Sequence, residues 1–149
     1  MRFVTRANIH VDRIATAWAI RRFVDPEATF EFVPRNRDVR QLDAIPFDVR
    51  GAELGHRAGR CTFESLIAKY ELTEPGLRRM AAIIRSADLP YEEDAPGEAL
   101  GVAAIFDGLR DADVSDDERL ARGIVVCDAL FAFCERAGGE EAKNASDGL

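Results

Sequence analysis

The chain has 149 residues, of which 47% are hydrophobic and 32% charged, and its formal net charge is −7 at pH 7. This length favours one domain with a single core, and the acidic balance argues against general nucleic-acid binding. No apolar run approaches the ~20 residues of a membrane span and no signal-peptide pattern opens the chain, so we expect no membrane contact and a cytoplasmic location.

The N-terminal half alternates short apolar runs with one strongly apolar helix. Residues 3–5, 29–33 and 45–49 predict strands. Between the first two lies the segment from Asp12 to Ile20, whose apolar residues cover nearly the whole circumference of a helix, so this helix must be buried. A strand, a helix and a strand in this order favour a right-handed parallel crossover.

The C-terminal half is dominated by helical signals. Predicted helices begin at Thr62, Thr73, Gly97 and Ser115. We therefore expect a single α/β, or α+β, domain over residues 1–137, with a small, mostly parallel sheet in the N-terminal half packed by helices and a helical C-terminal half. Residues 138–149 have little apolar content and are predicted to form a disordered tail.

The segment from Phe47 to Glu64 follows the third predicted strand and combines glycines with groups that carry chemistry. The glycines permit close turns that bring Asp48, Glu53 and His56 toward one point. Cys61 lies at the start of the next predicted helix. Its thiol could have a lowered pKa there, or the residue could be a small side chain without a chemical role. The cysteines of the chain have no disulfide-framework spacing, so we expect reduced thiols.

Two further polar residues are expected at the same place. His10 and Asp12 follow the first predicted strand, and the carboxyl ends of parallel strands lie at one edge of a sheet. These side chains should meet Asp48 and His56, with Asp88 joining from a later helix. Imidazoles and carboxylates make a mixed N/O site, suited to Mn²⁺, Fe²⁺ or Zn²⁺. The predicted metal ligands are His10, Asp12, Asp48, His56 and Asp88.

Further roles attach to this site. If it is catalytic, the metal would deprotonate a water molecule and Glu53 would be the general base. Arg13 and Arg57 are predicted to hold a small anionic ligand or substrate, since guanidinium groups suit oxyanions. The sequence leaves a homo-oligomer open.

A plainer interpretation needs no metal. Asp12 fits a helix cap, and Asp48 and Asp88 can pair with arginines as ordinary structure. In that case the protein is a binding or assembly module without chemistry.

A resemblance to a known family rests on segments spread over residues 3–136. The segments include Asp12-Arg-Ile-Ala15, Ile20-Arg-Arg-Phe23, Phe30-Glu-Phe-Val-Pro34, Gly51-Ala-Glu-Leu-Gly-His56, Arg60-Cys-Thr-Phe63 and Asp128-Ala-Leu130. They resemble the chromate-resistance family, the domain that forms the C-terminal part of ChrB-type proteins. The resemblance implies a role in chromate resistance or sensing in bacteria, although lysine is usual in that family where this chain has His10.

A second resemblance concerns the layout of the site. His10, Asp12, Asp48 and His56 are spaced in a way similar to the DHH-type metal-dependent phosphoesterases, in which such residues hold Mn²⁺ ions that activate water. Arg13 stands where a second acidic ligand is expected, and the Asp-His-His triplet is reduced to Leu54-Gly55-His56, which favours one metal or none. A degenerate phosphohydrolase of this type is the alternative function.

Overall fold

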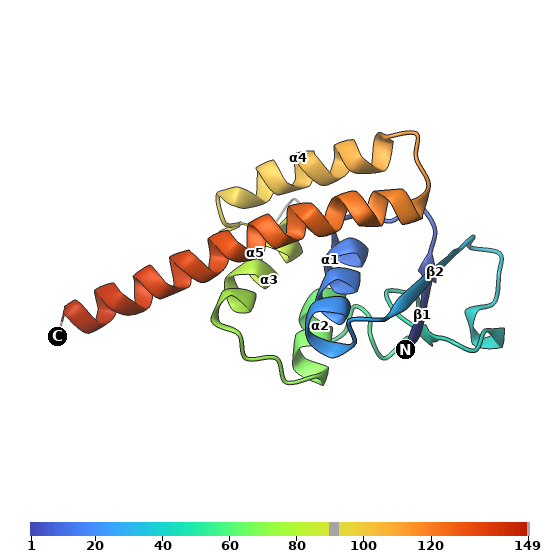
Figure 1. Ribbon diagram of the computed structural model, residues 1–149, viewed down its shortest axis with the longest axis horizontal. Coiled ribbons are helices and arrows are strands. Elements are labelled where there is room, and N and C mark those ends of the chain that lie inside the picture. Colours follow the sequence, from blue (N-terminus) through green and yellow to red (C-terminus); the bar gives the residue numbers. More distant parts are fainter. Residues whose placement is uncertain (90–92, 149) are drawn as a thin grey trace.

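The computed structural model describes residues 1–89 and 93–148, with the side chains of 141 and 142 left out. Its described part contains a three-stranded parallel sheet in the order β2-β1-β3, followed by a helical C-terminal half (Figure 1). The strands are β1 (Arg2–Arg6), β2 (Thr29–Val33) and β3 (Ile45–Pro46). The predicted fold class is confirmed.

β1 is the central strand and is buried on both faces. Phe3 belongs to the main core, whereas Val4 packs with Val33 and Val39 in a smaller cluster. β3 is shorter than the predicted strand 45–49 because Asp48 adopts a left-handed φ of 47°, although the N–H of Phe47 still donates to the carbonyl oxygen of Val4 at 3.0 Å. The chain therefore turns away from the sheet just after β3.

α1 (Val11–Ala19) is the buried helix that the sequence predicts. Ile14, Trp18 and Ala19 are each 0–2% exposed, and the described part of the fold packs around them. The helix continues as one π-helical turn, η1 (Ile20–Val24), before the chain enters β2. A short 3₁₀ turn, η2 (Val39–Gln41), precedes β3.

Four further helices follow, of which α2, α3 and α5 pack against α1. They are α2 (Thr62–Lys69), α3 (Pro75–Asp88), α4 (Glu98–Asp111) and α5 (Asp116–Asp147). α3 packs against both α4 and α5, and Figure 1 shows these last two helices lying side by side in opposite directions. Ser115 caps α5 by accepting a hydrogen bond from the N–H of Glu118 at 3.2 Å. No helix in the described residues is long and apolar enough to cross a membrane.

α5 continues through residues 138–147, where the sequence predicts a disordered tail. Among the side chains of α5 that the structure describes, Cys134 is the last buried one, and beyond it α5 projects from the body of the molecule (Figure 1). The segment contains alanine, glutamate and lysine, which favour helix without tertiary support. Leu149 lies outside the described residues.

The contact between α5 and α1 depends on a glycine. A Cβ added at Gly123 would collide with Cγ2 of Ile14, so Gly123→Ala is expected to destabilise the fold by about 1–3 kcal/mol through overpacking. Gly108 in α4 is the matched control, since a Cβ there meets no atom within 4 Å. Gly108→Ala is expected to leave stability unchanged or to raise it by up to ~1 kcal/mol. Urea unfolding measures both, and equal stabilities would contradict the packing argument.

Candidate functional site

Asp12 joins two helices that are far apart in sequence. It lies in the first turn of α1, is 2% exposed, and its two oxygens accept hydrogen bonds from the N–H groups of Thr62 (3.0 Å) and Phe63 (2.9 Å). These are the first two residues of α2, whose N–H groups have no partner within the helix. Asp12 therefore is a helix cap, but it caps α2 rather than its own helix.

Asp48 is fixed beside Asp12 from the loop after β3. Its Oδ1 accepts a hydrogen bond from the Thr62 hydroxyl at 3.0 Å. Its Oδ2 faces Nε of Arg13 at 3.1 Å, and Nη2 of Arg13 donates to the Asp48 carbonyl at 3.0 Å. The carboxylate is thus oriented by groups from both α1 and α2.

His56 brings the carboxylates together. Its Nε2 lies 3.2 Å from Asp12, 3.5 Å from Asp48 and 3.6 Å from Asp88, the last residue of α3. One ligand atom each of Asp12, Asp48 and His56 lie within 4.8 Å of one another. We refer to Asp12, Asp48, His56 and Asp88 as the Asp–His cluster. Four of the five predicted ligands therefore meet.

The electrostatics show an excess of negative charge in this cluster. The hydrogen bond to Asp12, with the charges of the other carboxylates, raises the pKa of His56 to about 9 against the effect of burial. Burial, and after it the charge of Asp12, raises the pKa of Asp48 and raises that of Asp88 to about 6. Each shift has the direction expected where like charges lack a sufficient counter-charge.

The distances in the cluster match the edges of a metal coordination shell. Around a tetrahedral ion with bonds of about 2.1 Å, neighbouring ligand atoms are separated by about 3.4 Å. The distances from Nε2 of His56 to the three carboxylates are 3.2–3.6 Å. The group whose ligand atoms are mutually close comprises Asp12, Asp48 and His56, within 4.8 Å of one another, and among the described contacts Asp88 approaches it only at His56. A cation would therefore draw these side chains closer together, and the N/O donor set suits Mn²⁺, Fe²⁺ or Zn²⁺.

His10, the fifth predicted ligand, lies beside the cluster with another partner. It lines a pocket of about 430 Å³ together with Asp12, Asp48 and Asp88. Its Nε2 lies 2.7 Å from Oδ1 of Asp107 in α4, and since a carboxylate only accepts, this nitrogen donates. Burial lowers the pKa of His10. The ring thus belongs to the pocket wall, outside the group of close ligand atoms.

The residues predicted for catalysis and for anion binding are dispersed. Glu53 is exposed and pairs with Lys69 at 2.8 Å, which places it on the surface of the glycine-rich loop. Arg57 is also exposed in that loop. Arg13 is turned toward Asp48, so its charge is already shared with a carboxylate. The described structure does not bring Arg13 and Arg57 together around one anion.

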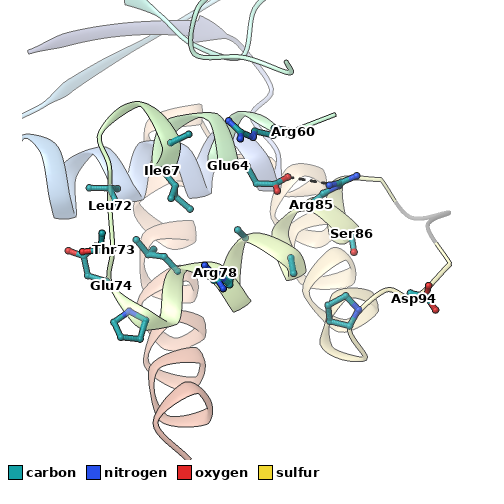
Figure 2. Close-up of a pocket in the computed structure, with 16 residues that line it drawn as sticks. Arg60, Glu64, Ile67, Leu72, Thr73, Glu74, Arg78, Arg85, Ser86 and Asp94 are labelled. Atoms are coloured by element: carbon teal, nitrogen blue, oxygen red, sulfur yellow. Dashed lines mark ion pairs between the residues drawn. The ribbon is translucent and has the colours of Figure 1, made fainter. Parts of the chain in front are cut away.

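A larger hollow of about 980 Å³ lies between α2 and α3, with walls of mixed charge (Figure 2). Glu64 and Arg85 face each other across it at 3.9 Å, and its floor includes Ile67 and Leu72. Among the described residues, no member of the Asp–His cluster lines this hollow. Asp12, Asp48 and Asp88 line the smaller pocket instead, whereas His56 is not among the described residues that line it.

The comparisons with known proteins place the chain in a family. A family model for the C-terminal domain of ChrB matches residues 3–134. The chain belongs to this chromate-resistance family. It is 40% identical over 132 residues to the protein ChrB of Cupriavidus metallidurans, a match that covers 87% of this chain and 39% of that relative. The chain thus spans well under half the length of this relative, and no solved structure matches it.

All residues of the Asp–His cluster lie within the part of the chain matched by the ChrB family model. Asp107 could not be predicted, because an aspartate on a helix surface carries no signal that it meets a histidine 97 residues earlier. For Cys61 two roles are compatible with the sequence. Burial of this side chain raises the pKa of its thiol, which favours the passive role.

Proposed function

We propose that this ChrB-type domain binds one divalent transition-metal ion through Asp12, Asp48, His56 and Asp88, and that this ion serves the chromate-resistance role of the family. The observation that carries the proposal is the convergence of three carboxylates on Nε2 of His56 within 3.2–3.6 Å. The ligands come from α1, from the loop after β3 and from the end of α3, and the fold itself assembles them.

Charge balance supports a cation over an anion at this position. The three carboxylates of the cluster are offset by Arg13 and by His56 only while the imidazole is protonated. A divalent ion that displaces this proton would neutralise the group completely. A chromate dianion would instead meet three carboxylates, so in the metal-free protein direct oxyanion binding at the cluster is disfavoured.

The arrangement gives less support to a DHH-type phosphohydrolase. Such an enzyme needs a general base close to the metal-bound water. Glu53, the residue predicted for that role, is 67% exposed and paired with Lys69. Metal binding without an assigned reaction is therefore the function that the described residues favour.

Metal binding by ligand variants tests the proposal. The chelator-treated protein is titrated with Mn²⁺ and Zn²⁺ by calorimetry, and bound metal is counted by elemental analysis. We expect about one ion per chain for the wild type and a loss of at least ~10-fold in affinity for His56→Ala and Asp48→Asn, since the first removes a ligand and the second replaces a charged ligand with a neutral amide.

The matched control is His10→Gln, which removes the other imidazole of the chain. Because Nε2 of His10 is engaged with Asp107, this variant is expected to bind metal like the wild type. Equal binding by the wild type and by His56→Ala would refute the proposed centre. A loss of binding in His10→Gln alone would move the site to the other side of the pocket.

A further inference from the structure

The turn that delivers Asp12 to the cluster is held by a residue from the far end of the chain. Asp116, the first residue of α5, accepts hydrogen bonds from the N–H of Asn8 at 2.9 Å and from the N–H of Ile9 at 3.1 Å. Asn8 has a left-handed φ of 62°, a conformation that a non-glycine residue keeps only with support. The two bonds to one carboxylate supply that support.

Asp116 is itself fixed by a buried arginine. Arg119 is 5% exposed and its guanidinium pairs with Asp116 at one edge. Its remaining N–H groups donate to backbone carbonyl oxygens at the end of α4 and in the following loop, those of Leu109, Arg110, Ala112 and Val114. Arg119 thus joins the α4–α5 connection to the carboxylate that holds the turn after β1.

We propose that Asp116, oriented by Arg119, is a positioning residue for the metal centre. This inference rests on the proposed metal binding. Asp116 holds the N–H of Asn8, which is four residues before Asp12 in the sequence. Asp12 must accept hydrogen bonds from the first turn of α2 and also face His56. A shift of the turn at Asn8 and Ile9 would tilt the start of α1 and displace Asp12 from both. Residues that hydrogen-bond a metal ligand commonly change metal affinity by ~10–100-fold, and Asp116, which holds the backbone three residues before Asp12, is expected to act at the lower end of that range.

The test compares two isosteric variants in the same helical turn. Asp116→Asn keeps the side-chain shape but removes one of the two carboxylate acceptors. Asp117→Asn is the matched control. Asp117 is exposed, and its substitution removes the same charge from the same end of α5. We expect Asp116→Asn to weaken metal binding by at least ~10-fold and to alter the visible spectrum of bound Co²⁺, and Asp117→Asn to stay within about twofold of the wild type.

A second measurement does not need the metal. The N–H groups of Thr62 and Phe63, which bond to Asp12, are followed by hydrogen exchange in chelator-treated protein. We expect faster exchange at these two positions in Asp116→Asn than in Asp117→Asn, with helix content by circular dichroism unchanged in both. Arg119→Lys, which keeps the charge but loses most of the carbonyl contacts, is expected to show the same pattern.

The outcomes separate the two proposals. Wild-type metal affinity in Asp116→Asn, together with unchanged exchange at Thr62 and Phe63, overturns the positioning role and leaves the metal centre standing. A wild-type protein that binds no metal overturns the proposed function, and with it the role of Asp116 at a metal centre.

Discussion

Asp12→Ala is expected to lower the free energy of unfolding by about 3–5 kcal/mol and to abolish metal binding. The variant leaves two N–H groups at the start of α2 without an acceptor, in a place where Asp12 is 2% exposed. It also removes the nearest of the three carboxylates around His56. A stability loss of this size corresponds to a fall of about 10 °C in Tm for a chain of this length.

Asp12→Asn separates the structural role from the metal role. The amide oxygen can still accept one of the two N–H groups, so roughly half of the stability loss is expected, whereas the charged ligand is gone. Urea unfolding with and without Zn²⁺ measures both effects. If Asp12→Ala unfolds at the same urea concentration as the wild type, the capping of α2 by Asp12 contributes little and our assignment of its role fails.

The second large effect concerns pH. In the metal-free protein the folded-state pKa of His56 is about 9, above its ordinary value of 6.5. Between pH 6.5 and 9 the folded state therefore holds a proton on His56 that the unfolded chain has lost. The contribution of His56 to the free energy of unfolding is fully present below pH 6.5 and disappears as the pH rises through 9. Because the ring is 46% exposed, screening reduces the expected loss to about 1–2 kcal/mol.

Asp88 changes stability in the same direction at lower pH. Its pKa is raised from 3.8 to about 6, so the folded state again binds the extra proton, and stability falls as the pH rises from about 4 to 6. The two slopes have different main causes: burial raises the pKa of Asp88, and the hydrogen bond to Asp12 raises that of His56.

Metal reverses this dependence. Binding requires a neutral His56 and an ionised Asp88, so metal affinity is expected to rise from pH 6 to 9 while metal-free stability falls. Urea midpoints measured at several pH values, with Zn²⁺ and with chelator, should diverge progressively toward alkaline pH. His56→Ala is expected to flatten the metal-free slope between pH 6.5 and 9, and an unchanged slope in that variant would show that other groups produce it.

The main elements could be predicted because their signals are local. The uninterrupted apolar run at residues 3–5 and the all-apolar surface of α1 indicate elements buried on every side, and they are buried. Asp88 could be placed correctly because it continues the apolar stripe of α3 by one turn. Parallel strand order then brings the loops after β1 and β3 to the same edge, which is how most of the cluster could be predicted.

The parts that escaped prediction depend on distant partners or on loop conformation. His10 turns to Asp107, and Asp12 turns to the start of α2, each across at least 50 residues of sequence. Glu53 pairs with Lys69 on the surface of the loop instead of turning toward the cluster. None of these side-chain contacts produces a periodic pattern in the sequence. The sequence predicts that order ends at residue 138, because few apolar residues follow. In the structure α5 continues to Asp147, since intrinsic helix propensity can extend a helix without apolar contacts.

The spacing of the cluster along the chain bears on the order of events during folding. Asp48 and His56 are close in sequence, but Asp12 lies 36 residues before Asp48 and Asp88 lies 32 residues after His56. Gathering all four around an ion in an unstructured chain closes two long loops and carries an entropic cost. In zinc fingers, by contrast, ligands a few residues apart let the ion nucleate the structure. On the proposed metal binding, we expect the ion to enter a preformed site late, after α1, α2 and α3 have docked. In the metal-free stage before that, the protonated imidazole holds the carboxylates together with Arg13 and the N–H groups at the start of α2.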